Sequence, residues 1–553
     1  MRDFDDKAEL RPPSQVMRLA RMGCGHPHRL SFMRILMRRI RDEAWRFEVS
    51  DWQIGDDGVG HAVYAAITPQ RTYSLVAFAH DLPAEKRSDR VIATAWDTTF
   101  VLFDGVPTQA DVARLRDNVP RQEAGRVCET ELTLSRANRS VRLWAHVVEA
   151  LSEGRQPDAE LLTEVGYLMR TTAVYGSGKF GCQDRAMIAD RPEFRAPFQA
   201  EMLTVYLIRA FVLDLVEHMA RVRNAAAVKL DPALRRSLGI GNSTGLGMAP
   251  FIMNHPMLIN NWVAAREEAL ARVRSLTTFT PADQAAFAKL VDRAVANVAA
   301  WRSEHPVQVA KLADLKADVA KLQAFVGAGQ IVSWDGIYGW AEDALSAEGC
   351  ELVVSLLLEP HGEFVDELAD CMASDEHWQI DGRQTVGELR ANLEEVYGFA
   401  EFTDWSAREE QARVWYTSQE KLEPRLGERF EEDRIAGYEQ PLQPARDACA
   451  LWQDLQQTPA DMSVSDYLAA DPTYRHAVRR AQITSRLPYA EVRDNTIHAT
   501  MLPIDLLRFK LAFFGARHFD PRSDRWLRIN MFAGAPFPHE LTPENADNWF
   551  YPA

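Results

Sequence analysis

Apolar residues recur three or four positions apart over most of the chain beyond residue 106, which is the spacing of an amphipathic helix. Thr280 and Pro281 begin one such segment as a natural N-cap and first helical residue. These patterns predict helices near 108–117, 136–153, 158–171, 198–224, 257–276, 281–301, 306–327, 341–358, 362–373, 385–399, 405–421, 443–456, 464–469 and 473–485.

A different pattern occupies residues 60–105, where β-branched and aromatic residues are frequent. The runs HAVYAAITP, TYSLVAFAHDL and RVIATAWDTTFVLFDG are separated by short polar turns. The turns are too short for crossover helices, so we predict a small antiparallel sheet and no Rossmann unit here. The last fifty or so residues mix a helix with strand-like pieces and end in a proline-rich tail.

Together these elements predict a mainly α fold, a multi-helix scaffold with a small antiparallel β-sheet near the N-terminus and a mixed α/β C-terminal segment. A chain of 553 residues is too long for one ordinary core. We expect three segments, with a glycine-containing boundary at 327–340. Residues 1–105 hold a basic helix and the sheet, 106–330 a helical domain with two glycine-rich loops, and 331–553 a second mainly helical domain with the mixed tail.

The net charge of −16 argues against nucleic acid as a partner, since most of the surface would repel a polyanion. Six scattered cysteines without a CxxC pair fit neither a disulfide framework nor a zinc ribbon. The N-terminus lacks the apolar core of a signal peptide, and charged residues interrupt the most apolar helix, at 198–224. We therefore expect a soluble, cytoplasmic protein that does not bind a membrane.

Residues 16–47 predict a basic helix interrupted at Gly23–Pro27. Its arginines, Arg34, Arg38, Arg39 and Arg41, alternate with apolar residues at helical spacing. A surface helix with a solvated basic face is one interpretation. The other is an arginine face directed at an anionic ligand or a partner subunit.

The stretch GIGNSTGLG, residues 239–247, holds four glycines between two predicted helices. Glycine allows positive φ and close approach of a ligand, and successive backbone N–H groups in such a turn bind anions. Asn242, Ser243 and Thr244 would add side-chain donors, which suits a carboxylate or phosphate substrate. A helix connection in which these residues only cap helix ends is the alternative.

His255, in the following NHP turn, is the candidate proton-transfer group of this loop. It precedes Pro256, which favours an extended backbone, and an imidazole there can act as a general acid or base. A capped structural histidine is the alternative interpretation.

A second glycine-rich loop lies within residues 169–185. Lys179 is predicted to pair an anion or act as a base, with Ser177 and Arg185 as further substrate-binding residues. The loop lacks the first glycine and the final Ser or Thr of a phosphate-binding P-loop, and we assign it no preceding strand, so ATP hydrolysis is not predicted. Cys182 is a candidate reactive thiol if nearby cations lower its pKa.

Two sets of side chains are candidate metal ligands, and neither has the spacing of a known metal motif. One is His26 and His28; the other is Glu359, His361, Glu363 and Asp366. We predict no metal site and assign no cofactor.

The sequence therefore predicts an enzyme that acts on a small anionic substrate by acid–base chemistry, as a lyase or isomerase. His255 and Lys179 would be catalytic, and the protein would be a homo-oligomer. One alternative is a non-catalytic scaffold or ligand-sensing protein whose arginine face at 34–41 docks a partner. Another is a cofactor- or metal-assisted oxidoreductase.

Overall fold

The structure is a computed structural model. It describes residues 9–83, 95–119, 128–175, 188, 190–245, 255–329, 331–372, 378–403, 416–417, 438–439, 443–493, 504–516, 519–521 and 526–551.

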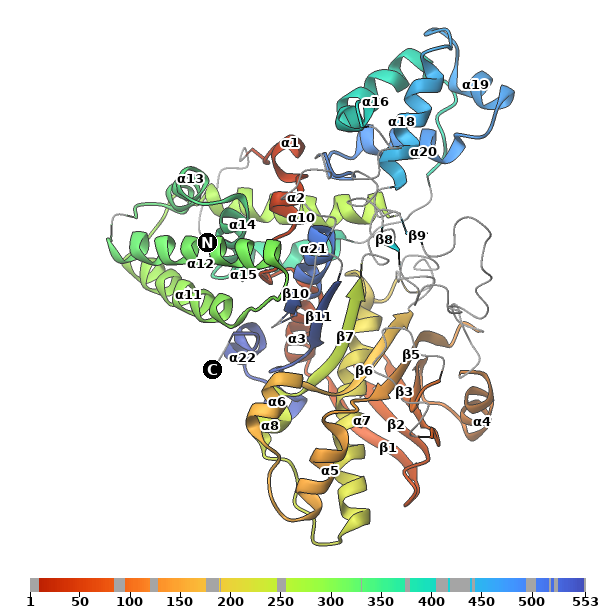
Figure 1. Cartoon of the computed structure of the whole chain (residues 1–553), viewed down its shortest axis with the longest axis vertical. Helices are drawn as coiled ribbons and strands as arrows, with labels where there is room; N and C mark the ends of the chain where they lie inside the picture. The colour runs from red at the N-terminus through yellow and green to blue at the C-terminus, as the bar shows by residue number, and fades with distance from the viewer. Residues whose placement is uncertain are drawn as a thin grey trace.

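A nine-stranded mixed sheet forms the centre of the described part of the chain (Figure 1). Its strand order is β1-β2-β3-β4-β5-β6-β7-β11-β10. The strands are β1 (Arg46–Ile54), β2 (Gly60–Ile67), β3 (Thr72–Ala79), β4 (Thr98–Asp104), β5 (Glu131–Arg139), β6 (Tyr167–Tyr175), β7 (Gly239–Gly245), β11 (Trp526–Met531) and β10 (Phe519–Pro521). The prediction of a small N-terminal sheet in a mainly helical scaffold is therefore wrong, because strands from near residue 46 to near residue 531 build one sheet.

The sheet is antiparallel everywhere except at one pair of strands. β1 to β6 form an antiparallel meander, β7 pairs with β11 and β11 pairs with β10 in the same manner, and only β6 and β7 run parallel. A parallel pair needs a crossover, which here contains the long helix α7 (Gln199–Arg223). β6 and β7 therefore end at the same edge of the sheet.

Helices pack against both faces of the sheet. Thr133 of β5 and Thr204 of α7 share a 2.6 Å hydrogen bond, and Phe100 of β4 packs edge-on against Phe211 of α7. Alternate side chains such as Val101 point to the other face, where they form a separate apolar cluster with α4 (Gln109–Asn118). Because both faces of these strands are buried, their sequences are nearly continuous apolar runs.

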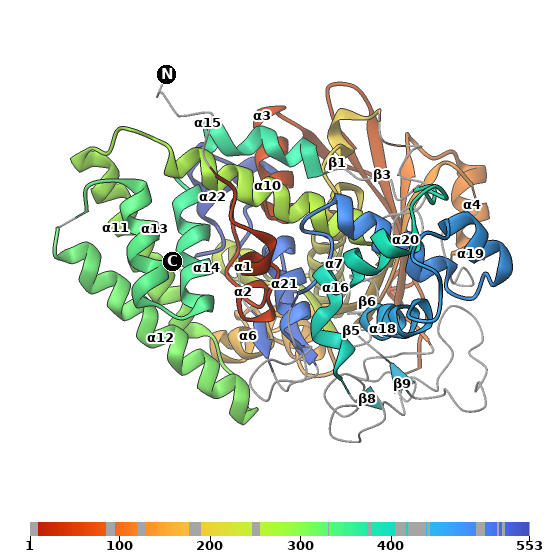
Figure 2. The same ribbon diagram turned by 90° about the horizontal axis from the view of Figure 1, so that it is seen from above.

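Helices make up most of the remaining described structure (Figures 1 and 2). They are α1 (Pro13–Val16), α2 (Leu19–Met22), α3 (Phe32–Asp42), α5 (Trp144–Ser152), α6 (Ala159–Val165), α8 (Pro232–Ser237), α10 (Pro256–Arg274), α11 (Pro281–Ala300), α12 (Pro306–Gly327), α13 (Trp334–Ala344), α14 (Ala347–Leu358), α15 (Gly362–Val365), α16 (Val386–Glu401), α18 (Gln443–Leu455), α19 (Val464–Ala470), α20 (Arg475–Arg486), α21 (Ile504–Phe514) and α22 (Pro543–Asn548).

The predicted helix at 281–301 is confirmed as α11, with Thr280 as its N-cap in a capping box with Asp283. None of the described helices is long and apolar enough to cross a membrane.

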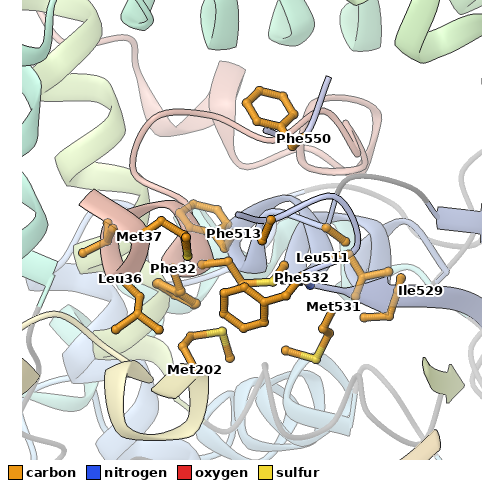
Figure 3. Packing of buried hydrophobic residues seen from close by; sticks show 14 of the residues in the cluster. Phe32, Leu36, Met37, Met202, Leu511, Phe513, Ile529, Met531, Phe532 and Phe550 are labelled. Atoms are coloured by element: carbon orange, nitrogen blue, oxygen red, sulfur yellow. Dashed lines mark hydrogen bonds between the residues drawn. The ribbon is translucent and has the colours of Figure 1, made fainter. Parts of the chain in front are cut away.

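One large apolar core joins the two ends of the chain. Phe32 and Leu36 of α3 pack with Met202 of α7, Phe513 of α21 and Phe532 after β11 (Figure 3). The basic helix predicted at 16–47 is thus part of this core, and its solvated face is a wrong prediction: α3 is buried on most sides.

A second, smaller core belongs to the helical unit of α16, α18, α19 and α20, which stands at the top of Figure 1. Its apolar residues, including Leu389, Leu451 and Val478, form a cluster separate from the main core. The unit is tied to α10 by a hydrogen bond of 3.0 Å from the backbone N–H of Tyr489 to Asn260.

Candidate functional site

The stretch GIGNSTG forms strand β7 and does not form the turn expected from its glycines. Its register places Asn242 opposite Thr171 of β6 and Ile529 of β11, so this backbone is engaged on both sides by the sheet. The glycines have a packing role: a Cβ on Gly241 would lie 2.5 Å from the Tyr167 ring, and one on Gly239 would lie 2.5 Å from the carbonyl oxygen of Met531.

β6 also differs from the prediction. The expected helix at 158–171 stops at Gly166, which has φ of 75° and caps α6, and a strand follows from Tyr167 to Tyr175. A strand therefore does precede Ser177 along the chain, contrary to the prediction. The P-loop pattern still lacks its glycine at Ala173 and its Ser or Thr at Phe180.

The predicted substrate-binding residues divide between described and undescribed parts of the chain. The side chain of Asn242 is half-buried, and its Nδ2 donates a hydrogen bond of 3.4 Å to Oγ1 of Thr171. Ser243 and Thr244 occupy β7, but their side chains lie outside the described part, as do residues Ser177, Lys179, Cys182 and Arg185.

His255 is the N-cap residue of α10 and is half-buried. Burial lowers the pKa of its imidazole, and the charges of Arg480 on α20 and Lys510 on α21 lower it further, to about 4. The imidazole is therefore neutral at pH 7. Three elements far apart in sequence thus contribute a neutral histidine and two cations whose charges act on it.

Arg480 is fixed by a buried carboxylate. Its Nε donates a hydrogen bond of 2.6 Å to Oε2 of Glu491, and the hydroxyl of Tyr397 donates one of 2.9 Å to the same oxygen. Burial alone would lower the pKa of Arg480, but Glu491 and Tyr397 outweigh it and raise the pKa, so the guanidinium stays charged.

Lys510 lies on the apolar helix α21, only 7% exposed, with its ammonium 5.3 Å from the centre of the Phe514 ring. Neither cation was predicted from the sequence. A usable signal existed for Lys510, because a lysine inside the run RFKLAFF predicts a buried charge, and buried charges are uncommon without a purpose or a partner. Arg480 is one of several arginines on α20, and nothing in the sequence distinguishes it.

The position of this cluster relative to the sheet follows from the chain path. β6 and β7 point toward the end of the molecule at which α10, α20 and α21 lie (Figure 1). Ligands of open sheets bind beyond the carboxyl ends of parallel strands, and β6 and β7 are the one parallel pair in the described sheet. His255 follows β7 by ten residues along the chain. We take His255, Arg480 and Lys510 as the candidate functional site.

The two sets considered as metal ligands have other roles. Glu359 pairs with Arg34, Asp366 pairs with Arg29, and His361 packs edge-on against Trp334. His26 and His28 are buried, and burial lowers the pKa of His26 to about 3, with Arg34 adding to the effect. Among the described residues, no group of three or more His, Cys, Asp or Glu is arranged to hold a metal ion.

The arginine face of α3 also points inward. Arg34 pairs with Glu359, Arg38 lies 3.4 Å from Asp547, and Arg39 lies 3.1 Å from Asp370. These guanidinium groups pair with carboxylates of the same chain.

No family model, curated protein or solved structure matches this chain.

Proposed function

We propose that the protein is an enzyme that binds a small carboxylate or phosphate beyond the carboxyl ends of β6 and β7 and uses His255 for proton transfer. The observation that carries the proposal is the neutral, half-buried imidazole of His255, on which the charges of Arg480 and Lys510 both act. Perturbed titratable groups that meet at one place are typical of active sites.

The two cations supply the electrostatic part of the site. An anion near Lys510 gains more from the charge than it would in water, because the low dielectric of a largely buried site screens less. The N-terminus of α10, a helix of 19 residues, contributes a favourable dipole for the same charge. Phosphate and carboxylate are the groups that such a setting selects.

Ligand binding would also tune the histidine. An anionic group offsets the positive charges of Arg480 and Lys510, and this raises the pKa of His255 from about 4 toward the ordinary value of 6.5. The imidazole becomes an effective base near neutral pH only when the substrate is bound. Lyase and isomerase reactions, in which a proton leaves a carbon or oxygen acid, fit such a group.

Thermal unfolding of the full chain with a panel of small carboxylates and phosphates tests this proposal. We expect at least one anion to raise the midpoint temperature in a saturable manner, and we expect Lys510→Met to abolish that shift while the protein remains folded. Lys289→Met is the matched control, since Lys289 is an exposed lysine on α11, outside the proposed site. The proposal would be contradicted if an anion raised the midpoint temperature of K510M as much as that of the unaltered protein. It would also be contradicted if no anion gave a saturable rise.

A further inference from the structure

A cavity of about 710 Å³ opens on the helical unit, at the start of α20. Its lining comes from two segments, the chain before α16 and the connection from α19 into α20. The lining residues are Trp378, Gln379, Pro472, Thr473, Arg475, His476 and Arg479. This volume is within the range of pockets that bind small ligands.

The charge of this lining is opposite to that of the chain as a whole. Arg475 and Arg479 contribute two guanidinium groups, and the described lining includes no carboxylate, although the chain carries a net charge of −16. His476 is held by Asp447, whose carboxylate lies 3.0 Å from its Nε2. A local positive site on an acidic protein favours an anion at this point on the surface.

Trp378 supplies a flat aromatic wall. The Nε of Arg479 donates a hydrogen bond of 3.1 Å to the carbonyl oxygen of Trp378, which ties the tryptophan backbone to α20. The guanidinium of Arg486 lies 5.4 Å from the centre of the indole ring. Residues Pro472 and Thr473 add an apolar and a polar side chain to the lining.

We propose that this cavity binds a nucleotide, with the phosphate on Arg475 and Arg479 and the base against Trp378. Guanidinium groups match phosphate oxygens in charge and fork geometry, and an indole face stacks on any nucleobase. The site is separate from His255, because Arg479 faces the cavity while its neighbour Arg480 acts on His255. The proposal of a nucleotide site does not depend on the proposed function.

Isothermal titration calorimetry of the full chain with AMP tests the proposal, with inorganic phosphate and adenosine as separate titrations. We expect saturable binding of AMP at one site, at least about tenfold tighter than either fragment, because phosphate and ring contacts each contribute. Arg475→Ala, at an exposed position, should weaken AMP about tenfold or more, as should Trp378→Leu. Arg383→Ala is the matched control, an exposed arginine of the same unit outside the cavity lining, and should leave AMP binding within about twofold.

Three results would overturn the proposal. The first is no saturable AMP binding up to about 5 mM, the weak limit of a specific site. The second is an equal loss of AMP affinity in the R475A and R383A variants, which would mean that AMP is held by diffuse electrostatic attraction. The third is binding of a single-stranded RNA oligonucleotide without binding of AMP, which would mean that the surface takes a polymer.

Discussion

Arg34 and Glu359 form a buried, doubly hydrogen-bonded ion pair between α3 and the end of α14, with both N···O distances at 2.5 Å. The side chain of Arg34 is fully buried, that of Glu359 is 4% exposed, and the guanidinium also lies 4.4 Å from the centre of the Phe550 ring. The pair connects the N-terminal helix, the helical layer and the C-terminal tail.

Replacing Arg34 with methionine should destabilise the protein strongly. The substitution leaves the carboxylate of Glu359 buried without its partner, and an uncompensated buried charge costs about 3–5 kcal/mol of unfolding free energy. Urea unfolding measures the loss. The double variant R34M/E359M removes both charges and should recover part of the stability, because two apolar side chains replace the pair.

Arg41→Met provides the control for this prediction. Arg41 pairs with Asp42, which is 59% exposed, and an exposed pair contributes less than about 1 kcal/mol. If R34M and R41M lose equal amounts of stability, the buried pair does not have the importance inferred from its geometry.

Gly241→Ala should disrupt the junction of the parallel strands. The added methyl group would meet the ring of Tyr167 at 2.5 Å, so the ring or the strand must move, and overpacking of this kind costs about 1–3 kcal/mol. Gly327→Ala is the matched control, because a Cβ there meets nothing within 4 Å and alanine favours the helix by about 0.5–1 kcal/mol. The midpoint temperature of thermal denaturation should fall for G241A and rise for G327A. An unchanged midpoint in G241A would contradict the close approach of Gly241 to the Tyr167 ring.

Stability should fall as the pH drops below about 6.5. His26 has a pKa of about 3 in the folded protein and near 6.5 when unfolded, because burial and then the charge of Arg34 disfavour the imidazolium. Between these values the unfolded state binds the proton and the folded state does not. Stability from this group is therefore complete above pH 6.5 and is lost by about 1.4 kcal/mol per pH unit on acidification.

Urea unfolding at several pH values from 7.5 to 4.5 measures this slope, and the variant His26→Asn isolates it. Asparagine can replace the hydrogen bond from Nδ1 of His26 to the carbonyl oxygen of Pro27, which is 2.9 Å long. Glu351, with a pKa of about 2, loses its contribution only at pH values below its unfolded value of 4.5. Equal slopes in H26N and the unchanged protein would show that His26 titrates normally in the folded state.

The elements predicted most accurately are those that local pattern alone determines. α11 and α12 have long amphipathic repeats with a proline at the first position, and α7 is a long apolar helix, so each was located within one or two residues. These segments fold as their own periodicity dictates, and tertiary contacts do not alter the outcome.

The strands β5, β6 and β7 were missed because their evidence is not local. β6 follows α6 directly, and apolar spacing continues past Gly166, so the helix pattern extended into a strand. β7 has three glycines in seven residues, a composition that predicts a turn. Only the ring of Tyr167 and the backbone of Met531, distant in sequence, explain why glycine occupies this strand.

The candidate site likewise combines one residue that local pattern reveals with others that it does not reveal. His255 could be singled out because it lies in a short NHP turn next to a glycine-rich stretch. Its cationic neighbours, Arg480 and Lys510, come more than 200 residues later, and no local pattern connects them to it. The arginines of α3 were misassigned to solvent for a related reason: their partners Glu359 and Asp547 lie on distant elements.

Removing the charge of Lys510 should raise the pKa of His255. Burial and Arg480 would still hold it below 6.5, so we expect the Lys510→Met variant to titrate above about 4 but below the unperturbed value. The titration of the histidine 13Cε1 resonance, assigned by its loss in His255→Asn, measures the pKa directly. Arg486→Met removes a cation from the same helix as Arg480 and should leave this pKa unchanged, since Arg486 does not act on His255. A pKa of His255 near 6.5 in the unaltered protein would remove the electrostatic basis of the proposed site, whereas an upward shift in K510M alone would show that the charge of this lysine acts on the imidazole.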